Sequence, residues 1–155
     1  MRRSAPALVL STIFLPLVAC AVTQVGSVMH PSISGGLDIR AADGSQSRWT
    51  PDRCVSGDLA SFAGFDFLSS QDSGHLRAVL DPIDGPAARW TRGGAERERG
   101  ALILRRPDCV TLDLDVQPTA WRINDVREFA GHVSLSCTAP DGTRVEGRID
   151  VDHCH

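Results

Sequence analysis

Apolar and polar residues alternate in short stretches, separated by turn residues, from about Ile33 to the end of the chain. The clearest stretch is 110–116, where Val110, Leu112, Leu114 and Val116 alternate with Thr111, Asp113 and Asp115. A period of two places the aliphatic residues on the buried face of a strand and the carboxylates on the face toward water. Because sustained helical periodicity is nearly absent, the pattern predicts an all-β domain, either an antiparallel β-sandwich or a small barrel.

The same reasoning predicts further strands around residues 65–67, 76–80, 88–90 and 102–104. Gln117-Pro118-Thr119 is expected to turn the chain, so that Trp121 and Ile123 would lie on the next strand. One helical turn is expected at 58–63, with Asp58 capping its start and Gly64 its end. Other turns are expected at Asp43-Gly44, Asp84-Gly85-Pro86, Gly93-Gly94 and Asp141-Gly142.

Phe62, Phe65 and Phe67 form the densest aromatic group of the chain. They could pack in the core or line an apolar pocket. Only 5% of the residues are aromatic, and a domain of this size needs most of its aromatic residues inside. Core packing is therefore the prediction.

The last hairpin allows a prediction of strand register. A two-residue loop at Asp141-Gly142 would place apolar residues opposite charged ones. A three-residue loop, 140–142, with Gly142 in the left-handed region and a bulge, pairs Val133 with Ile149 and Cys137 with Val145. Only the second register gives an apolar core face, so we expect it.

Five cysteines occur, and four of them, Cys54, Cys109, Cys137 and Cys154, lie in the predicted domain. The N-terminus of the chain has the pattern of an export signal, and an even number of cysteines in an exported domain predicts two disulfides. In the expected register Cys154 lies roughly 30 Å along the strand from the partner of Cys137, which excludes a Cys137–Cys154 bond. Of the two remaining pairings, Cys109–Cys137 with Cys54–Cys154 is favoured, because antiparallel pairing would bring Cys109 and Cys137 together.

The N-terminus has the pattern of an export signal: Arg2 and Arg3 precede an uncharged apolar run over 5–18. The run is too short to cross a bilayer, which takes about 20 apolar residues. It ends in Leu17-Val18-Ala19-Cys20, which resembles the lipobox of bacterial lipoproteins. The alternatives are an ordinary secretory signal with an unmodified Cys20, or a core helix.

The resemblance implies a signal peptide over 1–19, a lipidated tether over 20–32 and a single β-domain over 33–155. It implies that Cys20 carries the lipid and that the membrane is a partner through this anchor. In the family, aspartate just after the cysteine retains a protein in the inner membrane. Ala21 occupies that position here, which implies the outer membrane, facing the periplasm or the cell surface.

The amino-acid composition excludes several classes of enzyme mechanism. All 16 basic residues are arginine, and tyrosine is absent, which excludes P-loop and Schiff-base mechanisms that need a lysine. The formal charge of −3 would become −5 if residues 1–19 were removed with Arg2 and Arg3. Nucleic-acid binding is not expected, because it depends on a basic patch.

No catalytic or metal-binding motif stands out, and no catalytic residue, metal ligand or cofactor is predicted. Asp113 and Asp115 could join Asp150 and Asp152 in a calcium-binding cluster, but a solvated outer face explains them better. Zinc is disfavoured, because the cysteines are widely spaced, and the cluster His153-Cys154-His155 fits a disulfide cysteine on a solvated tail. His132 is expected to point outward from a strand. The mixed-charge run 92–100 is expected to be an exposed loop, although a partner-docking role is open.

The C-terminal segment 147–155, with the hairpin before it, resembles the ends of small secreted lipoproteins of uncharacterised function in high-GC bacteria such as myxobacteria. This resemblance transfers no functional residue. The sequence thus favours a lipid-anchored envelope protein acting as a binding or structural module with an envelope protein partner. One alternative is an inhibitor of an envelope hydrolase, with the loop 92–100 as the candidate inhibitory loop. The other is a small hydrolase or metal-dependent enzyme.

Overall fold

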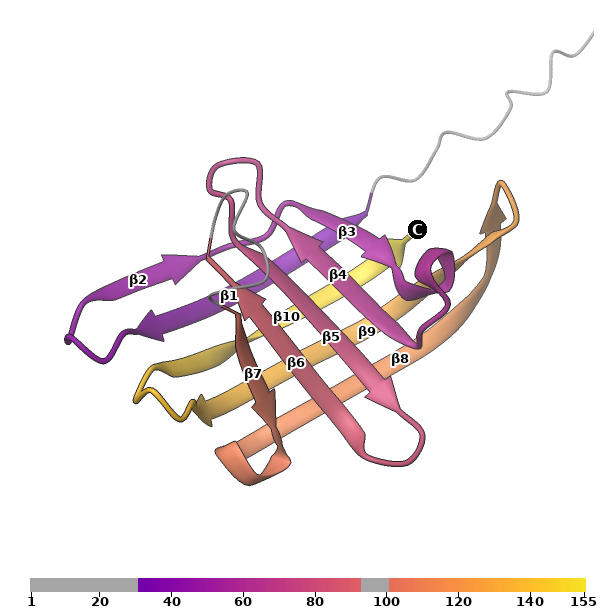
Figure 1. Ribbon diagram of the computed structural model, residues 1–155. Helices are drawn as coiled ribbons and strands as arrows, with labels where there is room; N and C mark the ends of the chain where they lie inside the picture. The colour runs from indigo at the N-terminus through magenta and orange to yellow at the C-terminus, as the bar shows by residue number, and fades with distance from the viewer. Residues whose placement is uncertain (1–30, 93–100) are drawn as a thin grey trace, which may run out of the picture.

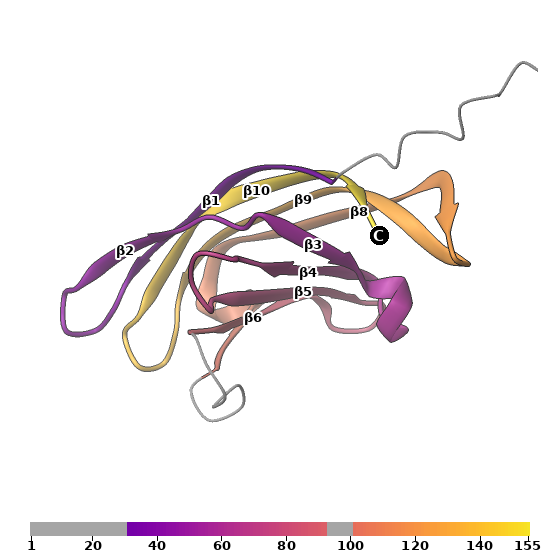
Figure 2. The same cartoon turned by 90° about the horizontal axis from the view of Figure 1, so that it is seen from above.

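The computed structural model describes residues 31–92 and 101–155. In this part of the chain, two five-stranded antiparallel sheets pack face to face (Figures 1 and 2). The predicted all-β fold is confirmed, and the sandwich, rather than the small barrel, is the arrangement adopted.

Sheet A contains the two terminal segments of the described domain and its three longest strands. Its order is β2-β1-β10-β9-β8. The strands are β1 (Ser32–Arg40), β2 (Gln46–Trp49), β8 (Cys109–Ile123), β9 (Val126–Thr138) and β10 (Arg144–Cys154).

Sheet B follows the chain order, β3-β4-β5-β6-β7. A 3₁₀ turn, η1 (Gly57–Ala60), connects its first two strands, and η2 (Arg106–Asp108) leads from its last strand into β8. The strands are β3 (Arg53–Ser56), β4 (Gly64–Leu68), β5 (His75–Asp81), β6 (Gly85–Thr91) and β7 (Leu102–Arg105).

The core lies between the sheets and consists of the inward-facing residues of both. Phe65, Phe67 and Leu76 of sheet B and Val133 and Ile149 of sheet A are completely buried. Burial of such side chains contributes about 1.5–3 kcal/mol each. Core packing of Phe65 and Phe67 is thus confirmed, whereas Phe62 is only half-buried.

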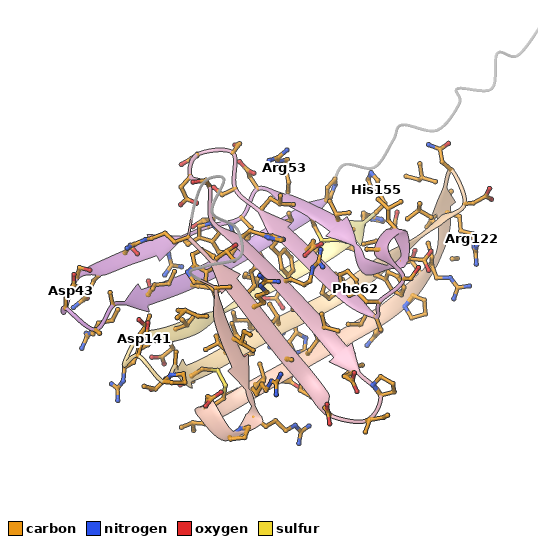
Figure 3. All side chains as sticks on the ribbon, viewed as in Figure 1. Asp43, Arg53, Phe62, Arg122, Asp141 and His155 are labelled. Carbon is orange, nitrogen blue, oxygen red and sulfur yellow. A yellow bond between two sulfur atoms is a disulfide. The ribbon has the colours of Figure 1, made fainter. Side chains whose placement is uncertain are left out.

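The register predicted for the last hairpin is confirmed. Val133 pairs with Ile149, Leu135 with Gly147 and Cys137 with Val145. The loop is 140–142, and Gly142 has a φ of +88°, in the left-handed region. Asp141 in this loop and Asp43 in the β1–β2 turn lie at one end of the sandwich, opposite Arg122 and His155 (Figure 3).

The two disulfides have the connectivity that the sequence favoured. Cys54–Cys154 joins β3 of sheet B to the end of β10 of sheet A, with Cα atoms 5.4 Å apart. Cys109–Cys137 joins neighbouring strands of sheet A, with Cα atoms 3.9 Å apart. One bond therefore ties the two layers together, and the other holds β8 against β9.

The turn predicted at Gln117-Pro118-Thr119 is wrong. Pro118 lies within β8 and pairs with Phe129 of β9, and the chain turns instead at Asn124-Asp125. Both loop residues have positive φ, +49° and +66°, as the type I′ turn of a two-residue hairpin loop requires. Proline is tolerated inside β8 because β8 is an edge strand, where alternate N–H positions point away from the sheet and need no ladder hydrogen bond.

Two further local predictions are corrected. Val110 is 95% exposed rather than buried, because the register shifts between Cys109 and Thr111 and the extra residue bulges outward. The helical turn is Gly57–Ala60, its start is capped by the Ser56 hydroxyl, and Ser61 rather than Gly64 takes the left-handed conformation at its end. The carboxylate of Asp58 instead accepts a hydrogen bond from the backbone N–H of Arg127 at 2.8 Å.

The four edge strands of the two sheets differ greatly in length. β2, β3 and β7 have four residues each, whereas β8 has 15. Short edges are a common protection against unwanted pairing with other chains. β8 is therefore the one edge in the described sheets that presents a long run of backbone.

Candidate functional site

Three histidine–carboxylate pairs are the contacts closest to catalytic chemistry among the described residues. His75 pairs with Asp66 on the outer face of sheet B, with Nε2 2.9 Å from Oδ1. His132 pairs with Asp113 on the outer face of sheet A at 2.8 Å, and His153 pairs with Glu128 near the end of β10 at 2.7 Å. The first pair lies on sheet B, whereas the other two lie on sheet A, four residues apart along β9. In each pair the imidazole contacts a carboxylate rather than a serine or cysteine side chain.

Asp66 is the most constrained carboxylate of these pairs. It lies on β4, its side chain is 13% exposed, and it also accepts two hydrogen bonds from the Arg77 guanidinium, at 2.9 and 2.7 Å. Burial raises the pKa of Asp66, but the hydrogen bonds from His75 and Arg77 outweigh burial and hold this pKa below its usual value. Arg77 in turn lies over the ring of Phe62, 5.0 Å from its centroid, which adds a cation–π contact to the cluster.

Replacing Asp66 by asparagine is expected to lower the free energy of unfolding at pH 7 by about 1–3 kcal/mol, because Arg77 loses a partly buried charged partner. Since the folded-state pKa is depressed, the stabilisation is complete above about pH 4 and is lost as the pH falls through the folded-state value. Urea unfolding between pH 2 and 7 should therefore show a weaker acid dependence in Asp66→Asn. The control is Asp38→Asn, whose exposed pair with Arg48 should contribute less than about 1 kcal/mol. Equal effects of the two variants would contradict the assignment.

The four aspartates considered as a calcium cluster bind separate partners. Asp113 contacts His132, Asp115 accepts from the Gln117 amide, and Asp150 forms an ion pair with Arg148. Asp152 accepts a hydrogen bond from the backbone N–H of His153. Within residues 31–92 and 101–155, no group of three or more histidine, cysteine, aspartate or glutamate side chains is arranged to hold a metal ion. The outer face of sheet A is therefore a charged strand face.

Glu128 is a buried carboxylate that the sequence did not single out. Its residue is 2% exposed, and Oε1 accepts hydrogen bonds from the Thr119 hydroxyl at 3.0 Å and contacts Nδ1 of His153 at 2.7 Å. The hydrogen bond to Glu128 raises the pKa of His153, which favours the charged imidazole beside the carboxylate. This contact fixes the bulged end of β10, where the ladder shifts between Val151 and Cys154.

A small cleft lies where the end of sheet A meets the β4–β5 loop. At its base, Trp49 of β2 and Trp90 of β6 form an edge-to-face pair with ring centroids 4.6 Å apart. The indole N–H of Trp49 is buried without a hydrogen-bond partner, and Gly74 packs directly over it. Both rings are at least 95% buried, so the cleft offers a ligand little aromatic surface. The alternation of apolar and polar residues could not predict this pair, because the two tryptophans lie in different sheets.

Two candidates from the sequence lie outside the described residues: Cys20, and residues 93–100 of the mixed-charge run. His132 faces outward as predicted, and Cys154 is in a disulfide as predicted. The solvated tail predicted for 153–155 is wrong, because β10 runs to Cys154, which is completely buried. In the described ranges, no helix has the length and apolar character that crossing a membrane takes.

No family model, no curated protein and no solved structure matches this chain, so its function has to be argued from its own residues.

Proposed function

We propose that this chain is a lipid-anchored cell-envelope protein whose β-domain serves as a binding or structural module without catalytic activity. The observation that carries the proposal is the cysteine arrangement. The four cysteines of the domain pair with one another, in Cys54–Cys154 and Cys109–Cys137. Structural disulfides are typical of oxidising compartments, and Cys20 remains as the fifth cysteine at the end of the lipobox-like segment.

The position of the first strand is compatible with an anchor at Cys20. β1 begins at Ser32, where it pairs with Asp152 next to the C-terminus. Eleven residues separate Cys20 from Ser32. At 3.3–3.6 Å per residue, they allow up to about 40 Å between a lipidated cysteine and the sandwich. Ala21 after the cysteine supports placement at the outer membrane.

The separation of the polar groups favours binding over catalysis. A catalytic site brings a nucleophile or acid, a base and polar groups together in one pocket. Here His75 contacts its carboxylate on sheet B, whereas His132 and His153 contact theirs at two different points of sheet A. The two disulfides, one between the sheets and one within sheet A, instead provide a rigid scaffold, which is what a binding module requires.

Replacing Cys20 by serine is expected to abolish acylation and to release the protein from the membrane fraction, because the anchor depends on this one sulfur. Intact mass spectrometry of the detergent-extracted wild type should show a chain that begins at Cys20, carries acyl groups and has lost four hydrogens in two disulfides. In Cys20→Ser the acyl mass should be absent, and more than 90% of the protein should resist sedimentation with membranes.

Ser27→Ala, in the same segment, is the control and should behave as wild type. A native protein that begins at Met1 without acyl groups, or a Cys20→Ser variant that stays in the membrane fraction, would overturn the proposal.

A further inference from the structure

The outer side of β8 is an open sheet edge. β8 is the last strand of sheet A and pairs only with β9 among the described strands. In an antiparallel edge strand, alternate residues direct both N–H and C=O away from the sheet. The bulge at Val110 and the ring of Pro118 delimit a regular run, Thr111–Gln117, whose ladder to β9 is continuous. This run, here called the β8 edge, presents backbone donors and acceptors to an additional strand.

The side chains of the β8 edge differ between its two faces. On the outer face, Asp113 and Asp115 lie two residues apart, and the side chain of Asp113 is 65% exposed. Asp113 binds His132 through one oxygen, and a carboxylate has further acceptor capacity toward a cation. The edge is thus acidic along the face that water reaches.

The inner face of the β8 edge is apolar and incompletely covered. Leu114 is 8% exposed, but Leu112 and Val116 on either side are only half-buried. A strand added to the edge would place every second side chain over these two residues, and the intervening side chains beside Asp113 and Asp115. The fitting strand therefore alternates apolar and positively charged residues.

A second copy of the chain does not fit this edge. Antiparallel pairing of two β8 edges that keeps both outer faces on one side and overlaps at least five residues of each edge sets Asp113 opposite Asp113 or Asp115, or Asp115 opposite Asp115. Like charges directly opposite on neighbouring strands are destabilising. The aspartates therefore act against self-pairing and select a partner of opposite charge.

We propose that the β8 edge, Thr111–Gln117, binds an extended peptide segment of alternating basic and apolar residues by β-strand addition. The proposal names the partner class of the binding module proposed above and does not depend on the lipid anchor. The Cys109–Cys137 bond supports it, since it holds β8 on β9 at one end of the edge and so reduces the ordering needed on binding. Backbone hydrogen bonds supply affinity in this mode, and side-chain alternation supplies specificity.

The test uses the full-length oxidised protein in a nonionic detergent and a fluorescent, end-blocked octapeptide of alternating arginine and valine. Fluorescence anisotropy should detect saturable binding, and hydrogen exchange should slow at the backbone amides of 111–117. A peptide with glutamate in place of arginine should bind at least tenfold more weakly. An arginine peptide whose alternate backbone amides are N-methylated should also bind at least tenfold more weakly, because it cannot form the backbone hydrogen bonds to β8.

Reversing the charge of the edge with Asp113→Arg and Asp115→Arg should exchange the preference between the arginine and glutamate peptides. The matched control is Asp38→Arg with Glu146→Arg, two exposed carboxylates that pair across β1 and β10 of the same sheet. This control adds the same charge away from β8 and should change binding less than twofold.

The proposal is overturned by an absence of binding, by equal losses in the two double variants, by full binding of the N-methylated peptide or by self-association through β8 in sedimentation equilibrium. The mass measurement on Cys20 is independent of all these outcomes. A failure of the anchor and a failure of the edge are therefore distinguishable.

Discussion

Removing the Cys54–Cys154 disulfide, by replacing both cysteines with alanine, is expected to lower the free energy of unfolding by about 4–5 kcal/mol. The two residues are 100 apart in sequence, and the chain-entropy relation gives about 4.7 kcal/mol for a closed loop of this size. Domains of this kind have a net stability of about 5–15 kcal/mol. The bond also joins β3 to β10, so its loss leaves the two sheets without a disulfide between them.

The matched comparison is the double alanine variant of Cys109 and Cys137. Their separation is 28 residues, for which the same relation gives about 3.6 kcal/mol. Denaturant unfolding of the wild type and both variants under non-reducing conditions measures the difference. A larger decrease in the free energy of unfolding for the Cys109–Cys137 variant would contradict the prediction that the disulfide closing the longer loop contributes more to stability.

Replacing Gly131 by alanine is expected to lower the free energy of unfolding by at least about 3 kcal/mol. Gly131 has a φ of +146°, and an added Cβ would lie 2.0 Å from the carbonyl oxygen of Asp115 on β8. Backbone atoms on both sides of this contact belong to the β8–β9 ladder, so neither can move without breaking it. Backbone strain contributes about 1–3 kcal/mol, and the forced separation of the strands adds to it.

Gly44→Ala separates the two contributions. Gly44 also has a positive φ, +85°, but nothing lies within 4 Å of the site of its Cβ. We expect Gly44→Ala to lower the free energy of unfolding by about 1–2 kcal/mol, from the left-handed conformation alone. Thermal and denaturant unfolding of both variants provides the measurement. Equal destabilisation would show that the contact between Gly131 and Asp115 is unimportant.

Local patterns predicted most of the strands. The alternation around residues 76–80 and 102–104 corresponds to β5 and β7, and the register of the last hairpin followed from keeping Val133 and Ile149 on one face. The errors have a common origin. Pro118 was interpreted from its residue type and Val110 from the alternation over 110–116, whereas their conformations depend on β8 being an edge strand that bulges after Cys109.

The polar clusters were less accessible to sequence reasoning. Asp66, His75 and Arg77 lie within a dozen residues, but only the β4–β5 register sets Asp66 opposite Arg77. Glu128 and His153 are 25 residues apart and meet because β10 shifts its register after Val151. No spacing rule anticipates a contact that depends on a bulge.

The order of apolar and polar residues by itself determined the fold class, most strands and one hairpin register, because a period of two assigns each side chain to a face before any partner is known. Those faces, together with the cysteine count, also led to the disulfide pairing. Only the tertiary structure decided which strands lie at the sheet edges and which carboxylates meet cations. Both depend on how distant segments stack and pair, and the open edge of β8 is visible only once all its neighbours have been placed.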